Sequence, residues 1–467
     1  MQFGNSIAPQ GWRQLSLEDI CLKITSGGTP NRKNPDFYNN GEILWVKTKE
    51  LNNYFIYDTE EKITKDALNK SSAKILPKDT ILLAMYGATV GELGILSKEM
   101  TCNQACCALI INPKIADFRF VFYLLKLYKE NIKGLATGAA QQNLSATTVK
   151  GFTFNFPPLV EQQEIADFLF GIDDKIHLNT QTNQTLEQIA QAIYKSWFVD
   201  YEPTRAKAAV LAAGGSKADA ENAAMTAISG KSAADLATLK QQHPARYQQL
   251  ADLAAAFPAA LVPADDFGEI PAGWEAATLG DICDMKNGYA FKSADWTNSG
   301  IPVIKIGSVK PMLVEVEGNG FVDASFATTK PEFLVQSGDI LVGLTGYVGE
   351  VGRMPHGRNA MLNQRVAKFV PKEIDSTHTY YNFIYCLARQ DTFKRFAEGN
   401  AKGSAQANIS TKELLKYPTI ITDSIIHKAF ESFTAALMEK ILLHSSNSWQ
   451  LAKARDLLLP KLLNGEL

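Results

Sequence analysis

The sequence predicts an α+β protein in which two mixed α/β domains form a tandem pseudo-repeat and two long helices separate them. Three observations support this prediction: an internal repeat, short apolar runs followed by glycines, and two long stretches with apolar residues at helical spacing. The 467 residues correspond to about three compact units at roughly 150 residues each. Hydrophobic residues make up 46% of the chain and charged residues 21%, which excludes a disordered or fibrous protein.

The repeat begins with a matched pair of short motifs. Pro-x-Gly-Trp occupies residues 9–12 and 271–274, and Leu-x-Asp-Ile-Cys follows at 17–21 and 279–283, so the numbering offset is 262. Later matches keep the same order: 45–47 with 303–305, 90–94 with 348–352, 103–104 with 363–364, and 141–145 with 406–410. The offset drifts only between 258 and 265, as small loop insertions would cause. Because chance similarity does not keep its order over such a length, the repeat indicates a tandem duplication.

Each copy contains a short apolar run that predicts a buried strand. The runs are 81–86 and 340–344. Glycines recur after both runs, at positions 87, 91 and 94 in the first copy and 346, 349 and 352 in the second. Such glycines favour a tight loop in which a positive φ or a close backbone approach is needed.

Each copy ends in a stretch that predicts a long helix, at 161–198 and at about 427–463. The heptad positions of the first stretch and their counterparts at an offset of 265 form two sets for helix packing: Ile165, Ile172, Asn179, Leu186 and Ile193, and Phe430, Leu437, His444, Leu451 and Leu458. Both sets are apolar except at their centres, Asn179 and His444. At about 1.5 Å per residue, the first helix would extend roughly 57 Å, a length that suits a strut.

The domain boundaries follow from these elements. We predict a first domain at 1–157, a central spacer helix at 158–203, a second domain at 269–422 and a C-terminal spacer helix at 423–467. The segment 204–268 is an alanine-rich connector, since 20 alanines fall between residues 206 and 262. This composition predicts a partly helical connector with no site of its own, with weak helices at 233–239 and 247–253.

Several protein classes conflict with the sequence. No apolar stretch approaches the roughly 18 uncharged residues of a membrane-spanning helix. The first five residues lack the basic start and apolar core of a signal peptide. The six cysteines have no regular spacing and are too sparse for a disulfide framework, so we expect a cytoplasmic protein.

The net charge of −2 is unevenly distributed. Residues 1–160 carry a balance of +4, residues 161–270 a balance of −7, and residues 271–467 a balance of +1. An acidic middle between more basic ends fits two contact modules held apart by a spacer, and it equally fits chance.

Three motifs suggest chemistry but fail on residue order or spacing. Residues 155–158 (Asn-Phe-Pro-Pro) resemble the Asn-Pro-Pro-aromatic loop of amino-methyltransferases, but the aromatic residue precedes the prolines. Residues 230–232 (Gly-Lys-Ser) lack the earlier glycine and the buried strand of a phosphate-binding loop. Cys102, Cys106 and Cys107 have no histidine nearby and fit a buried strand better than a zinc site. We find no catalytic or metal constellation, and a binding role is favoured.

Basic, aromatic and amide side chains gather in both copies near the predicted loops. Phosphate contacts need Lys or Arg, and readout of base edges needs Arg, Asn or Gln within reach of a groove. The candidate DNA-binding residues are Arg32, Lys33, Lys47, Lys49, Tyr86, Gln104, Gln141 and Asn143 in the first copy, and Lys305, Lys310, Tyr347, Gln364, Arg365, Lys402, Gln406 and Asn408 in the second. For any single residue, the alternative is an ordinary solvated surface. The amides at matched positions favour a shared task, such as phosphate contact or loop bracing.

With these motifs, the chain resembles the specificity (S) subunit of type I restriction–modification systems. The resemblance rests on the two opening motifs of each half, Gly-Asp-Ile-Leu with Thr-Gly at 338–346, Gln-x-Asn-Leu/Ile-Ser, Pro-Pro-Leu-x-Glu-Gln at 157–162, and Leu-Leu-Pro-Lys-Leu-Leu-x-Gly-Glu at 458–466. Residues 192–200, with the alanine-rich insert after them, resemble the type IC branch. One departure is Asp423-Ser-Ile-Ile426, which replaces the Pro-Pro motif in copy two and leaves the start of the second helix open.

The resemblance implies two target-recognition domains, each reading one half of a bipartite double-stranded DNA site. The helices would pack as an antiparallel coiled coil and would dock two modification (methyltransferase) subunits, which restriction (translocase/nuclease) subunits join. If a pseudo-twofold axis relates the helices, matched positions meet near their midpoints, so we predict that Asn179 faces His444 in a polar layer. This chain would bind no cofactor and would not be an enzyme by itself, while its partners would use S-adenosylmethionine, ATP and Mg²⁺. Two other classes remain open: a self-sufficient DNA methyltransferase, and a scaffold that binds no nucleic acid.

Overall fold

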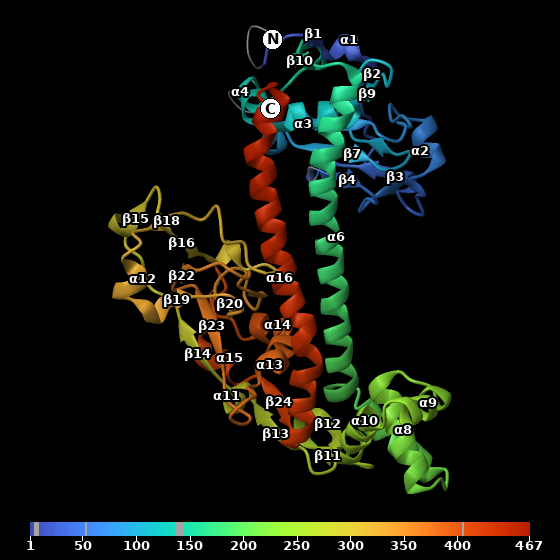
Figure 1. Cartoon of the computed structure of the whole chain (residues 1–467), viewed down its shortest axis with the longest axis vertical. Helices are drawn as coiled ribbons and strands as arrows, with labels where there is room; N and C mark the ends of the chain where they lie inside the picture. The colour runs from blue at the N-terminus through green and yellow to red at the C-terminus, as the bar shows by residue number, and fades with distance from the viewer. Residues whose placement is uncertain (4–8, 52–53, 137–142, 404–405) are drawn as a thin grey trace. The chain divides into compact units, whose positions relative to one another are not determined.

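The computed structural model describes residues 1–3, 9–51, 54–136, 143–403 and 406–467 (Figure 1). By its internal contacts, the chain divides into two compact units. The first comprises Met1–His177 with Ser448–Leu467, and the second comprises Leu178–Asn447. Each unit holds one mixed α/β domain together with part of each of two long helices. Among the described residues, no helix is both long enough and apolar enough to cross a membrane.

The domain of the first unit is built on a five-stranded sheet. Its strand order is β2 (Cys21–Ser26), β9 (Cys106–Ile111), β6 (Ile81–Ala84), β7 (Leu93–Leu96) and β4 (Phe55–Ile56). Neighbouring strands are antiparallel except β4 and β7. β6 carries the predicted apolar run, and all four of its residues are buried. The other elements are β1 (Arg13–Ser16), α1 (Leu17–Ile20), β3 (Ile43–Val46), β5 (Lys62–Ile63), α2 (Lys65–Asn69), β8 (Thr101–Cys102), α3 (Phe118–Leu127), α4 (Lys129–Gly134), α5 (Ala146–Lys150) and β10 (Thr153–Phe156).

The domain of the second unit repeats this sheet strand for strand. Its order is β14 (Cys283–Asn287), β23 (Val366–Pro371), β20 (Ile340–Gly343), β21 (Val351–Arg353) and β17 (Met312–Leu313). The registers correspond as well, because Leu82 pairs with Ala108 in the first sheet and Leu341 pairs with Lys368 in the second. The repetition confirms the predicted α+β fold with two tandem domains.

The second domain has further elements around this sheet. They are β13 (Glu275–Thr278), α11 (Leu279–Ile282), β15 (Trp296–Thr297), β16 (Ile301–Ile304), β18 (Phe321–Val322), α12 (Phe326–Thr329), β19 (Leu334–Val335), β22 (Ala360–Leu362), α13 (Tyr381–Ala388), α14 (Asp391–Gly399), α15 (Thr411–Leu414) and β24 (Pro418–Ile421). β13 pairs with β24 as β1 pairs with β10, so the first and last strands of each domain close on each other.

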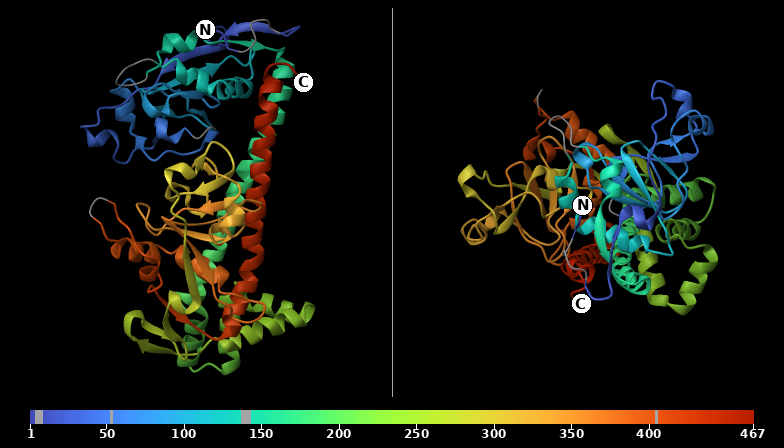
Figure 2. Two further views of the ribbon diagram at one scale, coloured as in Figure 1. Left: turned by 90° about the vertical axis from the view of Figure 1, so that its left-hand side faces the viewer. Right: turned by 90° about the horizontal axis from the view of Figure 1, so that it is seen from above.

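The two long helices are α6 (Leu159–Phe198) and α16 (Ser424–Leu463), each 40 residues long. Their bounds lie within three residues of the predicted ones. Asp423 explains how α16 begins without the Pro-Pro motif, because its carboxylate accepts a hydrogen bond from the Ile425 N–H at 2.7 Å. Within each unit, the segments of the two helices run side by side (Figures 1 and 2).

Within the second unit, hydrogen bonds show that the two helices are antiparallel. Asn179 Nδ2 donates to Asn447 Oδ1 at 2.9 Å, and Asn183 Oδ1 lies 3.0 Å from His444 Nδ1. Asn179 thus contacts Asn447, about one helical turn after His444, and His444 contacts Asn183, about one turn after Asn179. The shift arises because side chains of packed helices interleave rather than meet head on. The polar layer between the helices therefore includes Asn183 and Asn447 as well as the predicted Asn179 and His444. All the predicted packing positions along both helices are buried or half-buried.

Each domain is fastened to α6 by a buried tyrosine. In the first unit, Tyr123 on α3 donates to Asp173 Oδ2 at 2.6 Å, and Arg455 on α16 pairs with the same carboxylate. In the second unit, Tyr385 on α13 donates to the Glu187 carboxylate at 2.8 Å. The two tyrosines are separated by the same offset of 262 as the opening motifs, so the duplication kept the tyrosine at a matched position in both domains.

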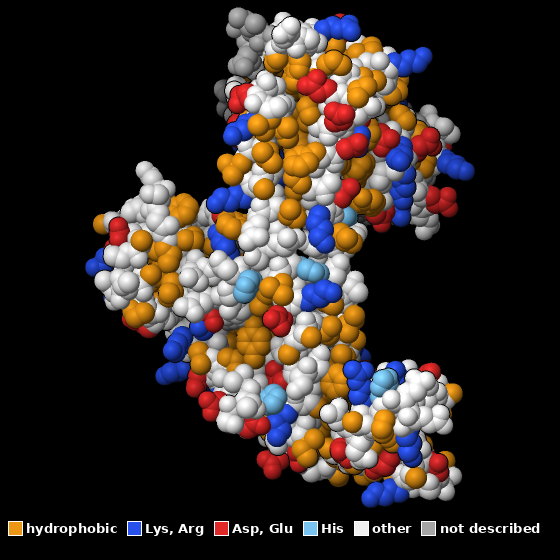
Figure 3. Space-filling model, viewed as in Figure 1, with side chains coloured by type: hydrophobic (Ala, Val, Ile, Leu, Met, Phe, Trp, Pro, Cys, Tyr) orange, Lys and Arg blue, Asp and Glu red, His pale blue; other side chains and the backbone are white. Residues whose placement is uncertain are grey.

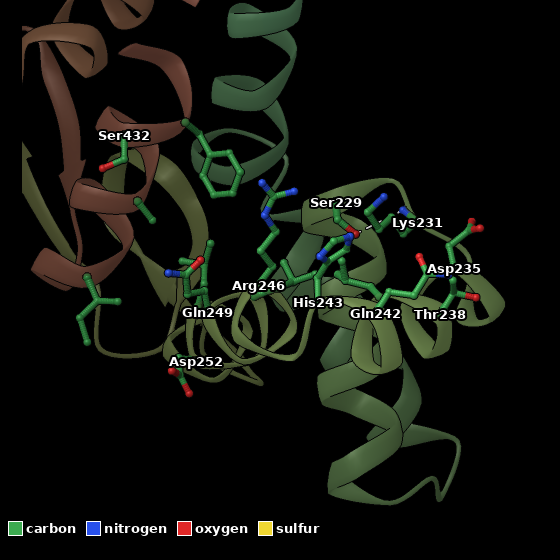
Figure 4. Close-up of a pocket in the computed structure, with 16 residues that line it drawn as sticks. Ser229, Lys231, Asp235, Thr238, Gln242, His243, Arg246, Gln249, Asp252 and Ser432 are labelled. Carbon is green, nitrogen blue, oxygen red and sulfur yellow. Dashed lines mark hydrogen bonds between the residues drawn. The ribbon is translucent and has the colours of Figure 1, made fainter. Parts of the chain in front are cut away.

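The connector is more ordered than the sequence predicts. It forms four helices, α7 (Glu202–Ala212), α8 (Lys217–Ser229), α9 (Ala233–Gln242) and α10 (Pro244–Ala256), and a β11 (Leu261–Ala264)–β12 (Gly268–Pro271) hairpin. Ser216 and Ser232 form capping boxes with Asp219 and Asp235, which start α8 and α9. A core that includes Met225, Leu236 and Leu250 holds the helices together. A groove of about 940 Å³ separates α9 and α10 from the start of α16 (Figure 4).

Candidate nucleic-acid interface

Three loops of the first domain are joined by backbone hydrogen bonds beyond the end of β6. The Met85 N–H donates to the Ala105 carbonyl at 2.8 Å, and the Leu144 N–H donates to the Met85 carbonyl at 2.8 Å. Tyr86 and Asn143 form an antiparallel bridge beside them. We call this set the loop frame; it comprises residues 85–86, 104–105 and 143–144.

The second domain contains the same loop frame at residues 344–345, 364–365 and 408–409. The Leu344 N–H donates to the Arg365 carbonyl at 2.9 Å, and the Ile409 N–H donates to the Leu344 carbonyl at 2.9 Å. Thr345 and Asn408 form the matching bridge. The duplication has therefore preserved a loop arrangement as well as a sheet. In each copy, the frame brings together polar candidates that lie far apart in the sequence.

A matched pair of glycines supports the loop frame and was missed by the sequence analysis. A Cβ added at Gly27 would lie 2.2 Å from the Asn103 carbonyl oxygen, and one at Gly288 would lie 2.3 Å from that of Asn363. No side chain fits at such distances, so both positions require glycine. The offset of 261 between the two positions falls within the range of the repeat, and it is the signal that could have revealed them.

The amide candidates lie on or beside the loop frame. Asn408 Oδ1 accepts a hydrogen bond from the Thr345 hydroxyl at 2.6 Å, and Gln406 Oε1 accepts one from Arg365 Nη1 at 3.3 Å. Each of these contacts joins side chains of two different loops and so braces the loops against each other. Exposed candidates on the frame or beside it are Gln104, Asn143, Tyr347, Gln364 and Lys402. Tyr86 is half-buried, and Gln141 lies outside the described residues.

Several candidate cations are engaged with carboxylates of their own domain. Arg32 makes cation–π contacts with the rings of Tyr38 and Trp45, at 4.6 and 4.7 Å from their centroids. The two ring centroids are only 5.8 Å apart, so Arg32 contacts both rings from the same side. It also pairs with Glu61 at 2.5 Å. Further ion pairs are Lys47 with Glu60 and Glu61 at 3.0 Å, Lys49 with Glu60 at 2.5 Å, and Lys310 with Glu315 at 4.0 Å. These internal pairs reduce the charge that Arg32, Lys47 and Lys49 offer to a phosphate.

The remaining basic candidates are Lys33, Lys305, Arg365 and Lys402. Within the described part of the chain, none of them has a carboxylate within salt-bridge distance. Lys305 Nζ lies 3.9 Å from the centre of the Trp296 ring, which holds it by a cation–π contact. On the face drawn in Figure 3, Lys and Arg side chains are interspersed with Asp and Glu. Positive charge is therefore presented at separate points and does not form a broad patch on that face.

Comparison with known proteins identifies the family that has these two repeated domains. A family model described as the type I restriction modification DNA specificity domain matches residues 9–188 and again residues 271–444. This chain belongs to that family. The two matches coincide with the two copies of the repeat, and they leave residues 189–270, with the helical connector, unmatched.

Full-length relatives agree with the family assignment. The chain is 31% identical to the HindI specificity subunit of Haemophilus influenzae, over 98% of this chain and 99% of the relative. It is 26% identical to the MjaIX specificity subunit of Methanocaldococcus jannaschii, over 98% of this chain and 94% of the relative. The crystal structure of a type I S subunit from M. genitalium has the same fold, with a TM-score of 0.51 and 18% identity over 98% of this chain and 97% of that one.

Members of this specificity family are the non-catalytic components of type I restriction–modification complexes. Within the described residues, no cluster of three or more His, Cys, Asp or Glu side chains could hold a metal ion. The assignment to the type IC branch stays a prediction, as do the roles of the individual DNA-binding candidates.

Proposed function

We propose that this chain is the sequence-specific DNA-recognition subunit of a type I restriction–modification complex, with each half reading one part of a bipartite site. The observation that carries the proposal is the loop frame that both domains repeat. Each frame gathers exposed amides around a rigid backbone, and amide side chains can read base edges in a DNA groove. Two such frames in one chain suit two separate half-sites.

The long helices would dock two modification subunits, which restriction subunits then join. Large apolar side chains are exposed along both helices: Phe168, Leu178 and Ile189 on α6, and Phe433 and Leu443 on α16. Those on α6 recur about every three helical turns and so lie on one side of the helix. At about 15 Å apart along the helix, these side chains form no continuous patch and would serve as separate anchor points for a docked subunit.

The composition of the connector predicts no site of its own, but the connector lines a groove beside α16 that would extend this docking surface. Phe433 and Ile425 form apolar parts of its lining, and Lys231, His243 and Arg246 contribute basic groups from the connector (Figure 4). The partner subunits would supply adenine methylation with S-adenosylmethionine, and ATP- and Mg²⁺-dependent translocation and cleavage. The complex would act in the cytoplasm, where it defends the cell against phage DNA.

Purification of the chain with and without its modification subunit tests this function. We expect the pair to co-purify with two modification subunits per chain and to shift a DNA duplex in a gel. Sequencing of methylated sites should then show two short half-sites separated by an unread spacer. DNA methylation by the chain alone, with labelled S-adenosylmethionine, would instead indicate a self-sufficient methyltransferase. Failure of both samples to bind DNA would indicate a scaffold.

A further inference from the structure

Two domains with the same loop frame can distinguish different DNA sequences only through side chains that differ between them. This reasoning rests on the function proposed above. Gln104 matches Gln364, and Asn143 matches Asn408, so these amides offer the same chemistry in both domains. The next position differs, because Ala105 in the first domain corresponds to Arg365 in the second. Tyr86 and Thr345 also differ, but Tyr86 is half-buried, and Thr345 is buried and donates its hydroxyl to Asn408. We therefore expect the difference in base preference at the position of Ala105 and Arg365.

Arg365 is held both at its backbone and at the tip of its side chain. Its carbonyl accepts a hydrogen bond from the Leu344 N–H at 2.9 Å, and its own N–H donates to Asn363 Oδ1 at 3.3 Å. At the tip, Nη1 donates to Gln406 Oε1 at 3.3 Å. The side chain is exposed, and no carboxylate among the described residues neutralises it. Its charge and its remaining N–H donors are therefore available at the surface.

We infer that Arg365 reads a guanine in the half-site of the second domain, and that Gln406 positions its guanidinium group. Two N–H donors of an arginine match the O6 and N7 acceptors that guanine presents in the major groove. Gln406 is a neutral acceptor, so it orients the guanidinium without neutralising its charge. Ala105 has neither a donor nor a charge, so the first domain lacks this contact at the matched position.

The competing role for Arg365 is a phosphate contact. A phosphate contact strengthens binding to every sequence alike, whereas a guanine contact discriminates at one base pair. Lys402 provides a matched control, because it is also exposed and has no carboxylate partner among the described residues. Its backbone pairs with Asn408, so it lies beside the same loop frame. We assign Lys402 to the phosphate role.

The test uses the chain in complex with its modification subunit and duplexes that carry the methylated motif. Each guanine of the second half-site is replaced in turn by adenine, and by 7-deazaguanine, which lacks the N7 acceptor. At one position, the unaltered complex should bind the guanine duplex about 5- to 150-fold more tightly, the range expected for a bidentate contact. Arg365→Ala should abolish both penalties at that position and leave the first half-site unchanged. Lys402→Ala should weaken binding to all duplexes equally.

Variants of Gln406 separate positioning from folding. Gln406→Ala should reduce the guanine preference at the same base pair. Gln406→Glu keeps the acceptor oxygen and should restore that preference, although its negative charge lowers the affinity for every duplex. Arg365→Met, which keeps a long side chain but has neither a charge nor an N–H donor, serves in place of Arg365→Ala if the latter does not fold.

Two results would overturn the inference about Arg365. In one, the Arg365 variants weaken all duplexes equally and the methylated motif is unchanged. In the other, the second half-site contains no guanine whose replacement is relieved by Arg365→Ala. If the complex methylates no bipartite motif at all, the proposed function itself fails, so the two failures can be told apart.

Discussion

His427, near the start of α16, lies in a cage of aromatic rings. Its ring stacks on Phe198 at a centroid distance of 5.4 Å, and Tyr380 and Phe383 lie edge-on at 4.9 and 4.7 Å. Nε2 faces the Thr422 N–H at 3.3 Å and must be unprotonated to accept it. Burial lowers the pKa of His427 to about 3, which the nearby Asp423 only partly opposes.

This histidine should make the second domain sensitive to mild acid. The unfolded chain binds the proton at pH about 6.5, so stability is complete above that pH and is lost as the pH falls toward 3. Between pH 7.5 and 5.5, we expect His427 to cost about 1.4 kcal/mol of unfolding free energy. His427→Gln keeps an acceptor, as Gln162 does at the matched position of α6, and should remove this part of the pH dependence. Urea unfolding followed by tryptophan fluorescence, with Trp197 in the same core, measures it. An equal acid sensitivity in the variant would contradict the assignment.

The helix pair offers a place where length can be changed without breaking contacts to either domain. The bond between Asn179 and Asn447 and the one between Asn183 and His444 enclose a short segment of both helices. We expect four residues inserted after Gln181, and four after Ser445, to keep both bonds and add about 6 Å. Because a base-pair step is about 3.4 Å, the unread spacer should lengthen by one to two base pairs. The same four residues inserted after Gln188 would instead break contacts with the second domain. They would separate Glu187, which accepts a hydrogen bond from Tyr385, from the rest of the α6 segment that packs on that domain.

Sequencing of methylated sites measures the spacer, and both half-sites should stay as they were. An insertion in α6 alone is the control, because it shifts the two helices against each other and should impair assembly. An active complex with an unchanged spacer would show that the helices do not set the distance between half-sites.

The sequence predicts the bounds of the two long helices better than it predicts which residues contact each other in the folded chain. Heptad spacing is a local property, so it gave both helices to within three residues. The pairing of Asn179 with Asn447 depends on how two helices interleave, which no single helix encodes. In the candidate site, ordered matches paired Gln104 with Gln364 and Asn143 with Asn408, and the structure has these residues in corresponding loops of the two domains. Residue type alone could not show that Arg32 is engaged by Tyr38, Trp45 and Glu61, since these contacts arise only in the folded domain.

At the scale of the molecule, the units do not coincide with the sequence repeat. The last turns of α16 complete the first domain, because Leu459 and Leu463 lie in its core and Tyr128 donates to Asn464 at 3.2 Å. We therefore expect exchange of residues 1–177 together with 448–467 for those of a relative to give a stable hybrid. Exchange of residues 1–157 alone should give a less stable one. Methylated-site sequencing should show that either active hybrid changes one half-site only; a change in both would contradict independent reading by the two domains.

The first unit is thus assembled from the two ends of the chain, whereas the second is one uninterrupted segment. During synthesis, the order of completion should therefore be the reverse of the order of translation. The domain made first must wait for the segment Ser448–Leu467 before its core closes, and the domain made second can fold while that segment is still in the ribosome. A chain that stops at Asn447 should consequently resist limited proteolysis in its second unit and be cut rapidly in its first.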